Sequence, residues 1–196
     1  MNSEFPKRLP LEGGEVELRG MRTADEAAVL AFAGRLEPHE LLFLRRDIRN
    51  PKVVAAWLRE IEAGQYETLL ALRGDTVVGC GTLVRDPLGW SAHVAEIRVV
   101  VAQDTRGQGL GTSLVRETFR LALVGGAEKI FAQMTTDQQG AIAVFDGLGF
   151  KPEAILREHV RDDAGAAYDL VVLSHIVAEV AATLRAYGVD GADDPD

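Results

Sequence analysis

The chain has 196 residues, of which 47% are hydrophobic and 6% aromatic, a size and composition typical of one globular domain. Its net charge of −9 argues against a nucleic-acid partner, which needs a basic face, and mildly favours cationic ligands such as amines. The apolar runs are shorter than the ~20 residues of a membrane span, and the first residues lack the apolar core of a signal peptide. We therefore expect a cytoplasmic protein that makes no use of a membrane.

The cysteine and histidine content predicts no metal site. Cys80 is the single cysteine, so neither an internal disulfide nor a zinc-binding spacing is available. It stands between two glycines in a strand pattern, which is more typical of a small core residue than of a nucleophile. The histidines are scattered along the chain, at His39, His93, His159 and His175.

The two ends of the chain read as less ordered than its middle. Residues 1–14 contain two prolines and a Gly-Gly pair and are expected to be a loose lead-in. Residues 15–19 alternate cleanly, which predicts a half-buried strand at the start of a single domain that spans residues 15–187. Residues 188–196 are acidic and are expected to form a disordered tail.

Two helix starts follow. Thr23 and Glu26 have the spacing of a capping box, which opens a helix over residues 24–34. Asn50-Pro51 starts a second helix, with asparagine as the cap and proline at the first helical position, and this helix runs to about Ala63. The segment between the helices, residues 36–49, is apolar and charged together, as in a short amphipathic helix at the edge of a sheet.

The middle of the chain predicts a hairpin and then a central strand. Residues 67–73 and 76–85 are rich in strand formers and flank Gly74-Asp75, a two-residue turn. Residues 94–101 are dominated by β-branched side chains. They lead into the loop Arg106-Gly-Gln-Gly-Leu-Gly111 and then into a helix that we expect to open at Thr112.

This strand, loop and helix form an anion-binding junction. The first turn of a helix leaves N–H groups without partners, and the aligned peptide dipoles add partial positive charge there. Glycines at 107, 109 and 111 allow a diphosphate to approach these amides. A Walker A loop does not fit, because no lysine occurs between Lys52 and Lys129. A dinucleotide fingerprint fails at Thr112, where its third glycine would stand.

The remaining elements complete a mixed pattern. Gly125-Gly126 ends the helix, residues 128–135 form a strand, and residues 153–160 and 167–173 form a last strand pair. Residues 174–187 carry an apolar face at helical spacing and predict an additional C-terminal helix. That helix packs on its own sheet or on a partner, which leaves a homodimer open.

Two motifs carry a family resemblance. The loop Arg106-Gly-Gln-Gly-Leu-Gly111 resembles the acetyl-CoA-binding signature of the GNAT superfamily of N-acetyltransferases, and residues 137–150 resemble the later family helix that ends in an aromatic residue and Gly-Phe. The resemblance extends from about Val16 to Leu173. It implies a mixed α/β (α+β) fold with a central sheet splayed at the cofactor site and flanked by helices. It also implies direct transfer of an acetyl group from acetyl-CoA, without a metal, to a primary amine of a small molecule or peptide.

The resemblance also assigns cofactor contacts. Backbone N–H groups on the splayed strand, at Val99 and Val101, would hold the pantetheine arm and the acetyl oxygen. Gln138 stands where family members often have asparagine, and Phe145 stands where they commonly have tyrosine. The pyrophosphate amides would be those of Arg106, Gly107, Gln108, Gly109, Leu110, Gly111 and Thr112.

The resemblance implies a candidate for the catalytic base but leaves the general acid open. Glu96 lies on the strand where many family members carry a carboxylate that deprotonates the amine; the alternative is a solvent-facing glutamate paired with Arg98. Phe145 cannot donate a proton to the departing thiolate. Either Tyr168 does so, or the thiolate leaves assisted by water and backbone dipoles. Glu40 is a candidate for the substrate site, because its segment walls the acceptor pocket in this family.

Two other functions stay open at this point. The missing tyrosine at Phe145 is compatible with a GNAT-fold acyl-CoA sensor or regulatory module with little catalysis. A third alternative is an interaction domain that uses the C-terminal helix. The pocket-forming segments carry no recognisable substrate motif.

Overall fold

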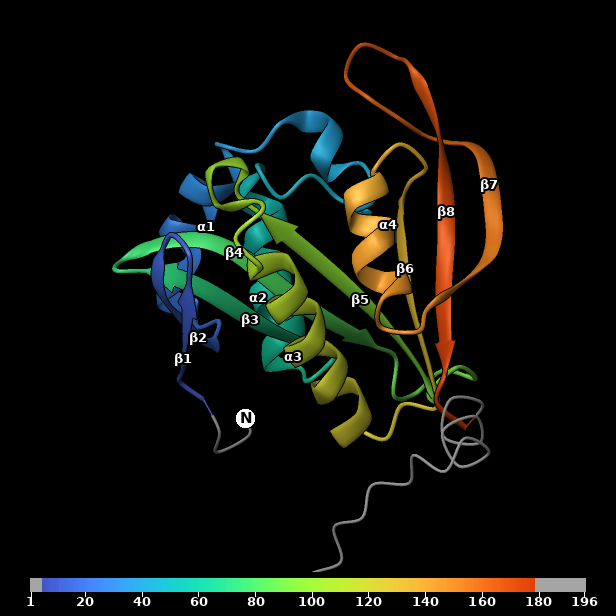
Figure 1. Cartoon of the computed structure of the whole chain (residues 1–196), viewed down its shortest axis with the longest axis horizontal. Coiled ribbons are helices and arrows are strands. Elements are labelled where there is room, and N and C mark those ends of the chain that lie inside the picture. Colours follow the sequence, from blue (N-terminus) through green and yellow to red (C-terminus); the bar gives the residue numbers. More distant parts are fainter. Residues whose placement is uncertain (1–4, 179–196) are drawn as a thin grey trace, which may run out of the picture.

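The computed structural model describes residues 5–178 and contains one eight-stranded sheet with the order β1-β2-β3-β4-β5-β6-β8-β7 (Figure 1). Every neighbouring pair is antiparallel except β5 and β6, which are parallel. The strands are β1 (Lys7–Leu11), β2 (Gly14–Gly20), β3 (Tyr66–Arg73), β4 (Thr76–Arg85), β5 (Val94–Val101), β6 (Lys129–Thr135), β7 (Lys151–Arg161) and β8 (Ala167–Ile176).

Helices cover both faces of this sheet. The helices are α1 (Glu26–Ala33), α2 (Pro51–Glu62), α3 (Leu110–Val124) and α4 (Gln139–Asp146), with short 3-10 turns η1 (Thr23–Asp25), η2 (Pro38–Leu41) and η3 (Gln103–Thr105). One buried cluster joins α1 and α2 to β3, β4 and β5, and a second joins α3 and α4 to β5, β6 and β8. Among residues 5–178, no helix has the length and apolar character required to cross a membrane.

The sheet opens between β5 and β6. The parallel ladder pairs Val94 with Lys129, Ala95 with Ile130 and Glu96 with Phe131, and there it stops. Both strands continue beyond the last pair, so their C-terminal halves diverge, as Figure 1 shows. The mixed fold and the splayed sheet that the family resemblance implied are confirmed.

The N-terminal segment is more ordered than expected. Residues 7–11, which we assigned to a loose lead-in, form edge strand β1 and pair with β2, with Leu9 opposite Val16. Leu9 and Leu11 pack against a buried cluster under α3. Pro10 misled the interpretation because proline interrupts central strands, yet an edge strand tolerates it.

The start of α1 differs from the predicted capping box, whereas α2 begins as predicted. The carboxylate of Asp25 accepts the backbone N–H of Arg22 at 2.7 Å and forms two 2.7 Å bonds with Arg19 of β2. Arg19 thus holds the Asp25 carboxylate, which caps the N–H of Arg22 at the start of η1, and Thr23 instead contacts Glu62 at 3.3 Å. In α2, Asn50 accepts the N–H of Lys52 at 3.0 Å, so that prediction is confirmed.

Two further boundaries shift. Helix α3 begins at Leu110, two residues before Thr112, because Gly109 is its N-cap. Strand β8 continues to Ile176, so the helix expected from Ser174 cannot include its first residues, since Ser174 pairs with Phe131 of β6. The rest of that predicted helix from residue 179, and the predicted acidic tail, lie outside the described residues.

Candidate active site

The glycine loop has the backbone geometry of an anion cradle. Gly107 and Gly109 have φ angles of +73° and +85°, a region that favours glycine. A Cβ added at either position would meet no described atom within 4 Å, so the space in front of these residues is open. The first helical bond of α3 runs from Ser113 N–H to the carbonyl of Gly109 at 3.0 Å. The amides just before Ser113 are therefore available to a ligand.

Two side chains of the glycine loop, those of Gln108 and Leu110, are held by contacts with neighbouring elements. The amide of Gln108 accepts a bond from Arg73 at 2.9 Å and donates to the carbonyl of Asp104 at 3.1 Å. Leu110 is only 1% exposed and packs under α3 with β2 and β4 residues. Gln108 and Leu110 can thus contribute to phosphate binding through their backbone, as the sequence interpretation required.

The splayed part of β5 presents free backbone groups to the gap. Ala102 N–H donates to the carbonyl of Val78 on β4 at 2.9 Å. Backbone groups alternate sides along an antiparallel strand, so the N–H groups of Val101 and Val99 point the other way, toward β6. Beyond Glu96 the β5–β6 ladder has ended. The two positions assigned to the pantetheine arm therefore have the required orientation.

A groove of about 820 Å³ joins the loop to the gap. Its walls include Val99, Val101, Thr112, Gln138 and Phe145, so the structure brings these predicted cofactor residues together. The ring of Phe145 is 5% exposed and meets Phe150 edge-on, with ring centroids 5.0 Å apart. The groove therefore connects the glycine loop with the free backbone groups of β5.

The turn η2 crosses the open end of the same groove. Glu40 forms an ion pair with Arg106 of the glycine loop at 2.5 Å, and His39 Nε2 lies 2.8 Å from Asp137 Oδ2 at the start of α4. All four residues border the groove. Glu40, which we expected at the acceptor site, is thus on the cofactor side. The sequence offered no signal for these contacts, because they join residues far apart in the chain.

A second cavity, of about 550 Å³, lies on the opposite face of β5, under α2. Glu96 is 4% exposed within it and accepts two bonds from Arg98, at 2.9 and 2.7 Å. Arg45 Nη2 lies 3.7 Å from the same carboxylate. Of the two alternatives for Glu96, the pairing with Arg98 is present, but the carboxylate is buried and does not face solvent.

Burial and pairing with Glu96 shift the pKa of Arg98 in opposite directions. Burial lowers the pKa of a guanidinium, but the hydrogen bonds and charge of Glu96 outweigh it and raise the pKa of Arg98 above its ordinary value. The ring of Tyr66 lies 5.8 Å from the same guanidinium carbon. Arg98 therefore stays charged and holds the Glu96 carboxylate in a fixed orientation. Sequence reasoning noted this pair without giving Arg98 a role.

The two cavities meet at the fork of the sheet. Val100 borders both of them. Glu96 and Phe131, the last paired residues of β5 and β6, border the 550 Å³ cavity, which is called the acceptor-side cavity below. A ligand lying in the gap from one face would thus be reached by a second ligand entering from the other face. The arrangement can support group transfer between two ligands bound at the same time.

Tyr168 lies apart from this fork. Its hydroxyl donates to Asp162 at 2.9 Å, which raises the pKa of the phenol, and its ring stacks on His39 with centroids 4.7 Å apart. It borders neither of the two cavities. The structure therefore does not bring Tyr168 together with Glu96 and Phe145. Within residues 5–178, no group of three or more His, Cys, Asp or Glu side chains could hold a metal ion.

Comparisons with known proteins agree with this geometry. Residues 35–150 match the acetyltransferase (GNAT) family model. The mycothiol acetyltransferase of Corynebacterium efficiens is 34% identical over 97 residues, which are 49% of this chain and 30% of that protein. The RimI N-alpha-acetyltransferase of Mycobacterium tuberculosis is 26% identical over 125 residues, 62% of this chain and 75% of that protein.

Among solved structures, yncA from Salmonella typhimurium with its cofactor acetyl-CoA superposes with a TM-score of 0.70 at 19% identity, covering 92% of this chain and 98% of that chain. This likeness shows the fold alone. The chain spans less than a third of the length of the mycothiol relative that it matches. The family model nevertheless covers more than half of the sequence, including the glycine loop, the splayed strand and α4. The chain belongs to the GNAT family of acetyltransferases.

Proposed function

We propose that the chain is an N-acetyltransferase that moves an acetyl group from acetyl-CoA to a primary amine by direct transfer in a ternary complex. The observation that carries the proposal is the fork at Glu96 and Phe131, where a groove that suits acetyl-CoA and a cavity that holds a buried carboxylate approach each other from opposite faces. Incubation with acetyl-CoA and a panel of amines, amino acids and peptides, following free CoA release, tests it.

The donor supplies an activated acetyl group as a thioester. The chain's part is to bind and orient it: the amides of the glycine loop and the dipole of α3 take the diphosphate, beside the ion pair of Arg106 and Glu40. The free N–H groups of Val99 and Val101 are aimed into the gap, where one can hold the pantetheine arm and the other can polarise the acetyl carbonyl. Gln138, at the N-terminus of α4, borders the same arm.

Glu96 is the proposed base. An amine must lose a proton to become a nucleophile, and a carboxylate within hydrogen-bond reach, directly or through one water, can accept it. The two bonds from Arg98 occupy only part of the capacity of the carboxylate, which has about four lone-pair sites. Arg98 acts as a positioning residue because it fixes the carboxylate toward the fork.

The environment of Cys80 favours direct transfer over a route in which the acetyl group is first bonded to a cysteine of the protein. Cys80 borders the acceptor-side cavity, but burial raises the pKa of its thiol to about 12. A thiol that stays protonated at neutral pH is a poor nucleophile.

We therefore predict that Cys80→Ala keeps most of the wild-type kcat, since the thiol takes no part in the transfer. The measurement is the steady-state rate at pH 7.5, together with mass spectrometry of wild type after mixing with acetyl-CoA alone. Acetylated Cys80, combined with an inactive alanine variant, would contradict direct transfer.

At position 145, where the family commonly has tyrosine, this chain has no side chain that can protonate the departing thiolate. Phe145 borders the groove without a hydroxyl, and Tyr168 is engaged by Asp162. A lost general acid typically costs ~10² to 10⁴ in rate. We therefore propose that the thiolate leaves assisted by water and backbone dipoles, and that turnover is slow for this reason.

Phe145→Tyr should accordingly raise kcat without much change in acetyl-CoA affinity, because it adds one hydroxyl at the edge of the groove. The gain requires a hydroxyl-to-sulfur distance of about 3 to 3.5 Å. Release of CoA under saturating acceptor is the measurement, with Phe119→Tyr as a control for a new hydroxyl on the same aromatic cluster. A brisk wild type and an unimproved Phe145→Tyr variant would mean that another group already serves as the acid.

The same residue supports the second candidate function, an acyl-CoA-binding sensor with little catalysis. In that case both wild type and Phe145→Tyr would bind acetyl-CoA tightly by calorimetry, and neither would release CoA whichever acceptor is added. The buried Glu96 in a separate cavity favours the enzyme, because a sensor has no need for a carboxylate on the far side of the fork.

A further inference from the structure

Arginines border the acceptor-side cavity, although the chain carries a net charge of −9. Arg45 and Arg46 line this cavity and also a neighbouring cleft of about 660 Å³ between their own segment and the β7–β8 hairpin. Both side chains are exposed to solvent. A locally basic border on an acidic protein attracts anions toward this opening.

The N–H donors of Arg45 and Arg46 are not saturated by hydrogen bonds within the described part of the protein. Arg45 is 3.7 Å from Glu96 Oε2, which is longer than a hydrogen bond. Within the described part of the chain, Arg46 makes no ion pair and no side-chain hydrogen bond. Arg98, by contrast, is committed to Glu96 through two bonds. Arg45 and Arg46 are therefore available for a ligand.

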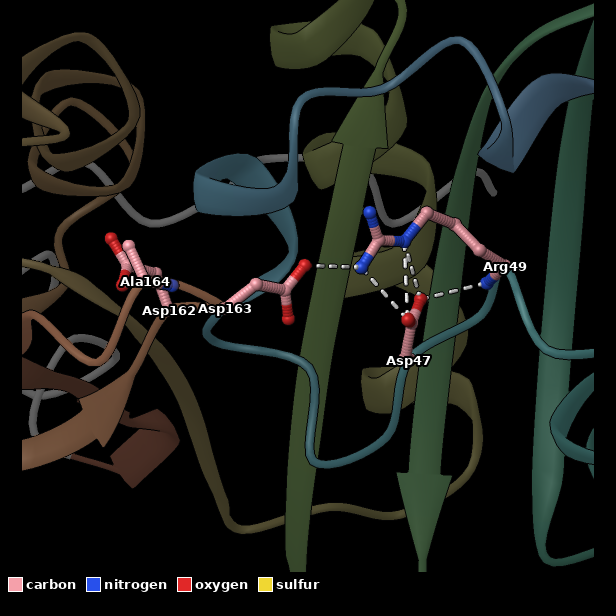
Figure 2. Close-up of polar contacts among 5 residues, drawn as sticks. All are labelled: Asp47, Arg49, Asp162, Asp163 and Ala164. Atoms are coloured by element: carbon pink, nitrogen blue, oxygen red, sulfur yellow. Dashed lines mark hydrogen bonds and ion pairs between the residues drawn. The ribbon is translucent and has the colours of Figure 1, made fainter.

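The segment that carries them is fastened in place. Figure 2 shows Arg49 between two carboxylates: its guanidinium donates to Asp47 at 2.9 and 3.1 Å and to Asp163 at 3.2 Å. Asp163 belongs to the turn between β7 and β8, where Asp162 accepts the N–H of Ala164 at 3.0 Å. The bonds from Arg49 lower the pKa of Asp47, so this carboxylate stays charged at neutral pH. Such tethering reduces the entropy lost when a ligand binds beside it.

Glu96 and Arg45 place opposite charges side by side, where the two charged ends of one small zwitterion could each meet a partner. Their charged atoms are 3.7 Å apart. In an α-amino acid the nitrogen and the carboxylate oxygens are separated by about 3 Å, since only two carbon atoms lie between them. An ammonium group facing Glu96 would therefore place its carboxylate against Arg45, with Arg46 close enough along the chain to share it. Arginine is well suited to hold a carboxylate through two parallel bonds.

The rest of the cavity indicates what the remainder of the acceptor is like. Aromatic side chains wall it, namely Trp57, Tyr66 and Phe131, and the indole N–H of Trp57 is already bonded to Thr68 at 3.0 Å. Glu60, Asp86 and Arg85 also border the cavity, so these remaining charged groups offer no net positive charge to a second anionic group. An apolar side chain suits these walls best.

We propose that the acceptor carries a carboxylate on the carbon next to its primary amine, and is a free α-amino acid with an apolar side chain. This proposal rests on the proposed acetyltransferase function. Glu96 takes the ammonium group, Arg45 and Arg46 take the carboxylate, and the aromatic walls take the side chain. The ammonium group first loses one proton to Glu96, and the free amine then attacks the thioester carbonyl. The new N–C bond forms as the C–S bond breaks, CoA leaves as the thiolate assisted by water, and the second N–H proton passes to that water.

The test compares phenylalanine with phenylalaninamide, which has the same side chain and amine but no negative charge. Wild type should have a kcat/KM for phenylalanine about 10- to 100-fold above that for the amide, the usual effect of a charged hydrogen bond. Arg46→Gln and Arg45→Gln should each remove most of this preference by lowering the phenylalanine value alone. The matched control is Arg59→Gln, at an exposed arginine of α2 that borders neither cavity, and it should keep the wild-type ratio.

Binding to the CoA-loaded protein, measured by calorimetry, separates the two proposals. If phenylalanine binds more tightly than its amide and neither is acetylated, the carboxylate site stands and the proposed transfer reaction fails. If the amide or a phenylalanine-headed peptide is acetylated as well as the free acid, the enzyme stands and the carboxylate site is overturned. Equal losses for both acceptors in Arg46→Gln would also overturn it, because they indicate damage to the fork.

Discussion

Gly109→Val is expected to reduce acetyl-CoA affinity at least about a hundredfold, because the cradle works by close approach of backbone to phosphate. With φ at +85° and no described atom within 4 Å of an added Cβ, the valine side chain would stand in the space that the diphosphate needs. The substitution also strains the backbone by ~1–2 kcal/mol. Calorimetry with acetyl-CoA and chemical denaturation measure the two effects separately.

Gly64→Val is the matched control for that strain. Gly64 follows α2, has a φ of +73° and is equally open, but it borders neither the cofactor groove nor the acceptor-side cavity. Both variants should lose a similar free energy of unfolding, and only Gly109→Val should lose affinity. Equal acetyl-CoA affinity in Gly109→Val and wild type would refute the cradle at this loop.

The sequence was sufficient for features that depend on local chemistry. The glycines of the loop predicted positive φ angles, which Gly107 and Gly109 have and Gly111, inside α3, does not. They also predicted a helix N-terminus, and Asn50-Pro51 predicted the start of α2. The hairpin around Gly74 also formed as predicted, with strands β3 and β4 on either side. Each signal lies within a few residues, so no knowledge of the tertiary fold was needed.

Contacts between distant segments could not be predicted. Asp25 became the cap of the first helical segment because Arg19, on a neighbouring strand, holds its carboxylate. Glu40 borders the cofactor groove, where it pairs with Arg106 of the glycine loop. Nothing in the spacing of these residues indicates either pair. The sequence likewise placed Tyr168 among the candidate acids, whereas its partner Asp162 is set by the turn between β7 and β8.

The separation of β5 from β6 was predictable from the sequence only in part. Alternation predicted that Glu96 and Arg98 share one face of β5, and the structure agrees, since both border the acceptor-side cavity. The β5–β6 ladder ends at Glu96 and Phe131, and the residue types of β5 alone do not indicate this end point. The family resemblance supplied that feature, and the register of the ladder confirmed it.

Glu96→Gln is expected to lower kcat/KM about a hundredfold at pH 7 and only a few-fold near pH 9.5. At neutral pH most primary amines are protonated, with pKa values of about 8 to 10.5, and the proposed base must remove that proton. As the pH rises, free amine becomes abundant and the need for a base declines. The pH profile of kcat/KM for wild type and variant, with one acceptor at fixed ionic strength, is the measurement.

Glu117→Gln controls for the loss of a buried carboxylate as such. Glu117 lies on α3, is buried and pairs with Lys7 and Arg120, yet borders neither the groove nor the acceptor-side cavity. It should change stability without changing the shape of the profile. Glu96→Gln also leaves Arg98 without its anion, and displacement of Arg98 would depress the rate equally at every pH. A loss that is uniform from pH 7 to 9.5 would therefore assign Glu96 to holding Arg98, whereas a loss that fades as the amine deprotonates assigns it to proton transfer.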